Sequence, residues 1–186
     1  MTMPTTYEVV ALLGPDGAGK STLARAVAEV ASRWDPSVVH RPIEVQGRSA
    51  TVVDIRTPRA IRQLADFADA ATEAALLGVS RASSAILVVA AVDSIMPAHR
   101  TSLANARQLG VGLLAVALTK CDVAEDEELL DLVELEIGEF LSREGFGYAP
   151  IVRIPARRTR PREREGREPE PRGPEGVEGL LSILSR

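Results

Sequence analysis

Short apolar runs alternate along the chain with segments of helical spacing. Tyr7–Leu13 is an apolar, β-branched run that Gly14-Pro15 ends, which is typical of a buried strand. Over Lys20–Trp34, apolar residues recur every three or four positions, which predicts an amphipathic helix. The same patterns predict further strands at Ile43–Gln46, Ser49–Ile55, Ala85–Val92, Val111–Leu118 and Ile151–Ile154. Further helices are predicted over Ala60–Leu77, Pro97–Leu109, Asp126–Arg143 and Val177–Leu184.

The alternation of strands and helices predicts an α/β fold, with a mostly parallel sheet and helices on both faces. The strands are almost continuously apolar, as expected for central parallel strands that are buried on both sides. Ligands of such folds bind at the carboxyl ends of the strands. The residues that follow each predicted strand are therefore the first candidates for a functional site.

Length and composition fit one globular domain over residues 1–186, because 45% of the 186 residues are hydrophobic and 26% are charged. The longest apolar runs have eight residues, far fewer than the ~20 that cross a bilayer, so no membrane partner is expected. A single cysteine, Cys121, excludes an internal disulfide and favours the cytoplasm. A net charge of −4 argues against general nucleic-acid binding.

Lysine is rare in this chain. Lys20 and Lys120 are the only lysines among 22 cationic side chains, and the other 20 are arginines. An ammonium is a compact point charge, whereas a guanidinium is a rigid planar fork. A lysine retained in such a background indicates a place where the fork does not fit.

The segment Arg157–Gly176 has no apolar periodicity and carries seven arginines, five glutamates and four prolines. This composition predicts a mobile, solvated loop over residues 157–176. A nucleic-acid contact is the alternative, and the interleaved glutamates oppose it.

The first predicted strand leads into a loop that matches the pattern G-x-x-x-x-G-K-[ST]. Glycines let backbone N–H groups converge on a phosphate, and the following helix directs its positive N-terminus at the same anion. Lys20 would neutralise the β- and γ-phosphates, and the Ser21 hydroxyl would bind Mg²⁺. The alternative is a structural glycine turn. The predicted phosphate-binding residues are Gly14, Pro15, Asp16, Gly17, Ala18, Gly19, Lys20, Ser21 and Thr22.

Asp54 is the last acidic residue of the strand Ser49–Ile55. An aspartate at such a strand end commonly holds the Mg²⁺ shell, often through water. Ser21 and Asp54 are thus the predicted metal residues, with a strand-end cap as the alternative role for Asp54.

Thr119-Lys120-Cys121-Asp122 follows the strand Val111–Leu118 and is close to the pattern N-K-x-D. A carboxylate that accepts from N1–H and the exocyclic amine selects guanine, because adenine lacks this donor pair. The lysine stem would lie over the base, and a backbone N–H after the last strand would reach the guanine O6. A plain strand-to-helix loop is the alternative. The predicted guanine-binding residues are Thr119, Lys120, Asp122, Ala156 and Arg157.

With these motifs, the chain resembles the GTP-binding domain of elongation factor Tu, a translational GTPase. The resemblance is densest over Ala85–Ile154, and it includes Ala85–Asp93, Met96–Arg100, Arg107–Val111, Asp126–Glu136 and Pro150–Arg153. It implies a P-loop G-domain fold, GTP and GDP as ligands, Mg²⁺ as cofactor, and a protein partner such as an activator or a ribosome-associated protein.

The departures from the family concern the γ-phosphate. The family carries Asp-x-x-Gly-His after its metal-site strand, whereas Asp54 is followed by Thr57 and Pro58 at the last two positions. The segment from Asp54 to Ala85 is also about ten residues longer than the family's. Without preorganised donors, hydrolysis should be slow. We therefore expect GTP hydrolysis that is weak or dependent on a partner.

Two other hypotheses remain open at this stage. Asp16 and the loop after it resemble the phosphate loop of thymidylate kinase, which would make the chain a nucleotide or small-molecule kinase with the Arg157–Gly176 segment as a lid. Alternatively, the chain is a decayed, non-enzymatic interaction module whose acidic helix Glu125–Glu139 docks a partner.

Overall fold

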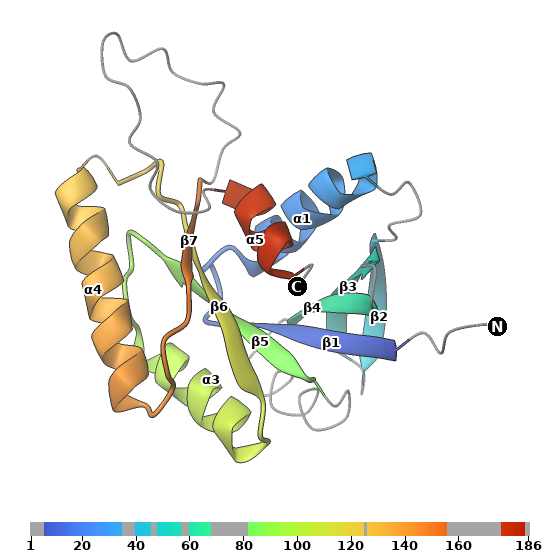
Figure 1. Ribbon diagram of the computed structural model, residues 1–186, viewed down its shortest axis with the longest axis horizontal. Coiled ribbons are helices and arrows are strands. Elements are labelled where there is room, and N and C mark those ends of the chain that lie inside the picture. Colours follow the sequence, from blue (N-terminus) through green and yellow to red (C-terminus); the bar gives the residue numbers. More distant parts are fainter. Residues whose placement is uncertain are drawn as a thin grey trace, which may run out of the picture.

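The computed structural model describes residues 6–34, 40–45, 48–56, 60–67, 82–124, 126–155 and 176–184, with the backbone alone for residues 6–8, 34, 40–45, 48–56 and 60–67. Its core is one seven-stranded sheet in the order β2-β3-β4-β1-β5-β6-β7 (Figure 1). The strands are β1 (Thr6–Leu13), β2 (His40–Val45), β3 (Arg48–Arg56), β4 (Ala60–Phe67), β5 (Ser84–Ala90), β6 (Gly112–Thr119) and β7 (Ile151–Ile154). The helices are α1 (Lys20–Trp34), α3 (Pro97–Gln108), α4 (Glu127–Arg143) and α5 (Gly176–Leu184).

Most of the sheet is parallel. The strands β4, β1, β5, β6 and β7 pair with one another in parallel, whereas β3 is antiparallel to β4 and β2 is antiparallel to β3. The strands β2, β3 and β4 therefore form an antiparallel meander, and β4 lies beside β1. The predicted α/β fold, a P-loop G domain with a mostly parallel sheet, is confirmed.

Two apolar clusters hold helices against the two faces of the sheet. On β1, Val10 and Leu12 pack toward α1 and α5, whereas Ala11 and Leu13 pack toward α3 and α4. Figure 1 shows the same division, with α1 and α5 together on one face. Because the strand is buried on both sides, every position of Val10–Leu13 is apolar and at most 1% exposed. This two-sided burial explains the unbroken apolar run that the sequence shows.

The predicted helix over Ala60–Leu77 is wrong in its first part, because residues 60–67 form the strand β4. This segment pairs with β1 on one edge and with β3 on the other. Backbone pairing on two edges outweighs the local helix preference of this segment, because tertiary context overrides intrinsic propensity. Residues 68–77 of that prediction lie outside the described residues, as does the predicted mobile loop up to residue 175. Gly176, its last residue, begins α5.

The other predicted elements agree with the structure to within a few residues. The helix Lys20–Trp34 has the predicted bounds, and the short strand expected at Ile43–Gln46 is β2. No helix in the part of the chain that the structure describes is long and apolar enough to span a bilayer.

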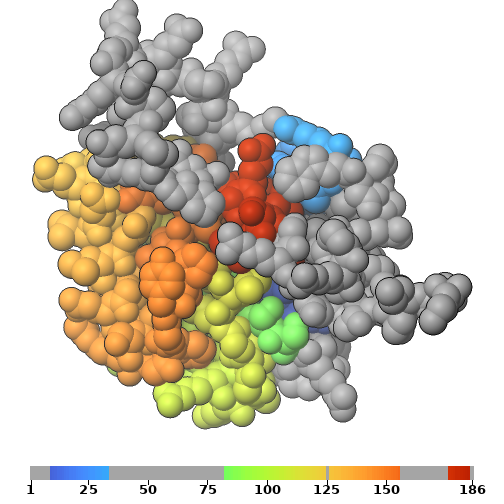
Figure 2. Space-filling view, in the orientation of Figure 1, coloured from blue at the N-terminus to red at the C-terminus, as the bar shows by residue number. Residues whose placement is uncertain are grey.

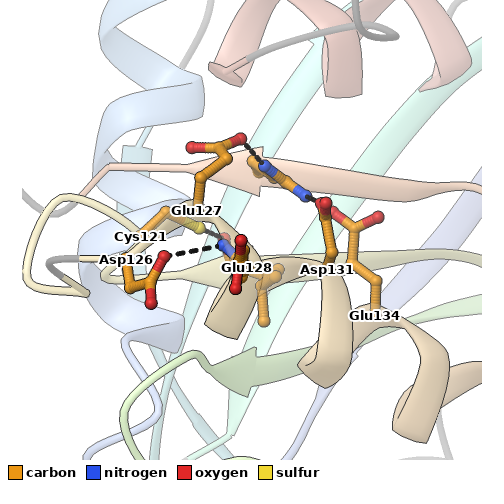
Figure 3. Close-up of polar contacts among 8 residues, drawn as sticks. Cys121, Asp126, Glu127, Glu128, Asp131 and Glu134 are labelled. Carbon is orange, nitrogen blue, oxygen red and sulfur yellow. Dashed lines mark hydrogen bonds and ion pairs between the residues drawn. The ribbon is translucent and has the colours of Figure 1, made fainter.

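Arg153 of β7 connects α4 to the edge of the sheet through ion pairs (Figure 3). Its guanidinium binds three carboxylates spaced four and three residues apart on one side of α4, those of Glu127, Asp131 and Glu134. Burial disfavours the charged guanidinium, yet the carboxylates outweigh burial and raise the pKa of Arg153. In the space-filling view, α4 and the orange segment after it form one side of the molecule, beside α5 (Figure 2).

Replacement of Arg153 should leave these three carboxylates close together without their shared cation. Because the side chain is 18% exposed, we expect Arg153→Leu to lower the free energy of unfolding by about 2–4 kcal/mol in urea titrations. Arg143 is the matched control, since its ion pair with Glu139 lies on the exposed surface of α4. Arg143→Leu should change stability by less than about 0.5 kcal/mol, and equal effects of the two variants would contradict the role of Arg153.

Candidate phosphate- and base-binding site

The phosphate loop, residues 14–21, connects β1 to α1 and depends on the backbone freedom of its glycines. Gly14, Gly17 and Gly19 have φ angles of 145°, 80° and 98°, in the region that L-residues rarely adopt. At Gly14 there is also no space, because a Cβ atom would lie 2.5 Å from the carbonyl oxygen of Val88 on β5. The glycine at this position therefore lets the loop lie directly against the next strand.

Lys20 lies inside the loop and is 7% exposed. Its Nζ donates to the carbonyl oxygens of Gly14 at 2.7 Å and Pro15 at 3.0 Å, so the loop itself holds the ammonium in place. Asp16 Oδ1 lies 4.0 Å from the same Nζ, but its side chain is 82% exposed, so this pair is weak. The lysine thus brings a fixed positive charge to the loop without a tightly bound carboxylate.

Thr119, at the end of β6, reaches the phosphate loop. Its hydroxyl is buried and lies 2.5 Å from the carbonyl oxygen of Ala18 and 3.2 Å from that of Val89. Gly19 packs against the same side chain, since a Cβ there would be 3.4 Å from the Thr119 hydroxyl oxygen. The structure therefore brings the loop after β1 to the end of β6. The two residues in contact, Ala18 and Thr119, are 101 residues apart in the sequence.

Lys120 follows in a left-handed conformation, with φ at 58°, and its Nζ lies 3.8 Å from Asp93 Oδ2. Beside it is a cavity of about 410 Å³. The phosphate loop and α1 supply Gly19 and Thr22, and the segment after β7 supplies Pro155. The remaining lining residues are Leu23, Ala26, Val30 and Arg33 of α1, Thr119 and Ile154 of the strands, and Gly176, Val177 and Glu178 of α5.

The other predicted site residues divide into two groups. Ser21 and Thr22 are exposed in the first turn of α1, and Asp122 is exposed in the turn after Lys120. Ala156 and Arg157 lie outside the described residues. Of the predicted site residues, Gly19, Thr22, Thr119 and Lys120 thus line one cavity, and the buried hydroxyl of Thr119 joins the two segments that supply them.

Cys121 lies between the two predicted base-binding residues Lys120 and Asp122. Its thiol donates to the carbonyl oxygen of Leu118 at 2.9 Å, and burial raises the pKa of the thiol to about 11. A thiol with this pKa is protonated at neutral pH and is a poor nucleophile. This hydrogen bond joins the turn after β6 to the end of the strand.

Asp54 is far from the phosphate loop, contrary to its predicted metal role. It pairs with Gln63 of β4, which in turn pairs with Val9, so Asp54 is level with the middle of β1. Two strand spacings and five residues along the strand separate it from Gly14, or roughly 19 Å. Because β3 is antiparallel to β4, its carboxyl end also points to the opposite edge of the sheet. This geometry corrects the expectation for Asp54.

Asp66 has the position that was expected of Asp54. It lies near the carboxyl end of β4 and pairs with Leu12, two residues before Gly14 on the adjacent strand. One strand spacing and two residues give a backbone separation of roughly 8 Å from Gly14. One feature of the sequence indicated this residue. The segment from Asp54 to Ala85 is about ten residues longer than the family's, and a metal-site aspartate at Asp66, twelve residues later, accounts for that excess.

A glycine loop and one lysine, set between a buried parallel strand and a helix, define the P-loop class of nucleotide-binding domains. Within that class, the family described as the elongation factor Tu GTP binding domain matches residues 65–184. This match covers more than half of the chain, and the chain belongs to this family. It carries a GTP-binding domain of the translational GTPase type. The matched segment begins next to Asp66, and the phosphate loop precedes it.

The contact between Gly14 and Val88 allows a direct test of the loop geometry. Gly14→Ala combines an unfavourable φ with a backbone clash, and should lower the free energy of unfolding by about 2–4 kcal/mol. Gly110→Ala is the control, because Gly110 has a φ of 71° with no atom within 4 Å of its Cβ position. It should cost about 1 kcal/mol. Chemical denaturation measures both, and a smaller loss for Gly14→Ala would refute the close approach.

Proposed function

We propose that the chain binds GDP and GTP across the cavity between the phosphate loop and the segment that follows β6. The observation that carries this proposal is the contact between Thr119 and Ala18, which joins the two segments. In this arrangement one ligand can place its phosphates at one segment and its base at the other.

The phosphates would lie at the N-terminus of α1, where backbone N–H groups and the helix dipole favour an anion. Lys20 would neutralise the β- and γ-phosphates from within the loop. At the other end, the stem of Lys120 would cover the base, and the carboxylate of Asp122 would accept from the guanine N1–H and amine. The backbone N–H of Ala156 would donate to the guanine O6, with Arg157 next to it in the sequence, and both residues lie outside the described residues.

Mg²⁺ fits the oxygen groups at the phosphate end of the site. The Ser21 hydroxyl is exposed in the first turn of α1, and Asp66 lies near the end of the strand beside β1. Hydroxyl and carboxylate oxygens suit this hard cation, which keeps much of its water shell. When bound, Mg²⁺ would neutralise charge on the β- and γ-phosphates. We therefore assign the metal role to Ser21 and Asp66 in place of Asp54.

Hydrolysis is proposed to be weak or dependent on a partner. Taking Asp66 as the first residue of Asp-x-x-Gly-His, the chain has Asp69 at the glycine position and Ala70 at the histidine position. A carboxylate would repel a γ-phosphate, and alanine cannot orient an attacking water. A protein partner in the cytoplasm, such as an activator or a ribosome-associated protein, would then be needed for rapid turnover.

Titration of the protein with fluorescently labelled GDP, GTP and ATP tests this proposal. We expect GDP to bind with a dissociation constant of about 1 μM or tighter, and ATP at least about tenfold more weakly. Lys20→Ala should abolish detectable GDP binding while circular dichroism shows an intact fold. Transfer of phosphate from ATP to nucleoside monophosphates would instead support a kinase.

Asp122→Asn is the matched variant for base recognition. An amide presents a donor to the xanthine O2, so this variant should lose affinity for GDP and gain affinity for xanthosine diphosphate. Equal binding of guanine, adenine and xanthine nucleotides by the unmodified protein would refute the role of Asp122.

The metal assignment predicts different effects for two aspartates of the same sheet. Mg²⁺ should increase the affinity for GTP by a factor that is about tenfold smaller in Asp66→Ala than in the unmodified protein, because an outer-shell carboxylate is lost. Asp54→Ala should leave this dependence within about twofold of the unmodified protein. Nucleotide titrations at a series of Mg²⁺ concentrations measure both, and the reverse order would restore the role of Asp54.

A further inference from the structure

His99 is a buried imidazole at the start of α3 that the proposed function does not use. It is the third residue of the helix and is 1% exposed. Both ring nitrogens have backbone partners: the N–H of Met96 lies 2.9 Å from Nδ1, and the carbonyl oxygen of Val88 lies 3.1 Å from Nε2. The ring thus connects the N-terminus of α3 to strand β5.

These two partners fix the protonation state of the ring. A backbone N–H only donates, so Nδ1 must accept and carry no proton. A carbonyl oxygen only accepts, so Nε2 must carry the proton. The neutral Nε2–H tautomer satisfies both partners. In a protonated imidazole, the second N–H would face the Met96 N–H, and one buried donor would lose its acceptor.

The carbonyl of Val88 also faces the phosphate loop. It is the oxygen against which Gly14 packs, at 2.5 Å from the position of a Cβ atom there. His99 therefore holds a carbonyl group whose oxygen limits where the loop lies. Lys20, which donates to Gly14 on the loop side, depends on the same arrangement.

We propose that His99 is a positioning residue of the phosphate loop, acting through the Val88 carbonyl, and that only its neutral form holds the loop in the conformation that binds phosphate. This inference rests on the proposed nucleotide binding and adds a regulation of that site by pH. Nucleotide binding then weakens as the pH falls through the pKa of His99.

Among the described residues, the charges that act on the ring are those of Lys20 and Asp93. Burial lowers the pKa of His99 from 6.5, and Lys20 lowers it further, whereas Asp93 and the two backbone hydrogen bonds raise it. Because the pKa is lowered in the fold, the neutral ring stabilises the site fully above pH 6.5. This contribution is lost as the pH falls from 6.5 through the folded pKa.

The test is the pH dependence of GDP affinity, measured with labelled GDP from about pH 8 down to the lowest pH at which circular dichroism shows the native fold. The dissociation constant of the unmodified protein should rise by up to about tenfold for each pH unit below the pKa of His99. GDP itself gains a proton on its terminal phosphate near pH ~6, so variants that share this titration are required.

Asn and Gln each carry an amide with one acceptor oxygen and a donor NH₂ group, and Gln reaches further than Asn. Neither His99→Asn nor His99→Gln has a side chain that titrates. Both variants should show a flatter pH profile than the unmodified protein. His40→Asn is the matched control, because His40 is the other histidine of the chain and lies on β2, at the far edge of the sheet. It should retain the full pH dependence.

A profile that is unchanged in both His99 variants would overturn this inference while leaving nucleotide binding established. If the unmodified protein binds no GDP at about pH 8, the proposed function and this inference fall together. Nitrogen-15 NMR of the histidine rings supplies a readout that needs no variant. Near pH 8 it should show the Nε2–H tautomer for His99, and the other tautomer would overturn the inference.

Discussion

The hydroxyl group of Thr119, at the end of β6, connects the two segments of the candidate site. Thr119 is 5% exposed, and its oxygen lies within hydrogen-bond distance of the Ala18 carbonyl. Loss of this donor would leave a buried carbonyl of the phosphate loop without its partner, which costs about 1–3 kcal/mol. The family pattern has asparagine at this position. In this chain the shorter side chain of Thr119 makes the connection to the phosphate loop. This bond holds the phosphate loop against the end of β6.

The sequence predicted those parts of the fold in which local pattern and tertiary environment agree. The strand β1 and the helix α1 were predictable, because glycines mark the turn between an apolar run and a segment of helical periodicity. The strand β4 was not, since it begins a segment whose alanines favour a helix, and it takes its extended conformation from pairing with β1 and β3. The error in the metal aspartate followed from this one, because a helix at Ala60 left Asp54 as the last acidic residue on a strand.

The contacts of the Val88 carbonyl group with Gly14 and His99 could not be predicted from the sequence either. Gly14, Val88 and His99 belong to three elements, and no local pattern relates them. The acidic helix gives a similar lesson, since its charges suggest a solvated surface. Three of its carboxylates instead hold Arg153, so part of this charge has a structural role. Pairwise chemistry of this kind depends on distances that only the folded chain supplies.

The scarcity of lysine has a practical consequence for covalent chemistry. Lys20 and Lys120 are the only side-chain amines in the sequence, and their ammonium groups lie at the two ends of one candidate site. Acylating reagents, and enzymes that acetylate or ubiquitinate lysine, therefore have no side-chain target elsewhere on this chain. Any such modification would fall on the two residues that we propose to contact the nucleotide. Lys20 is already buried by its own loop, whereas the Lys120 side chain is 32% exposed, so acylation at Lys120 is the modification whose extent a bound nucleotide would lower.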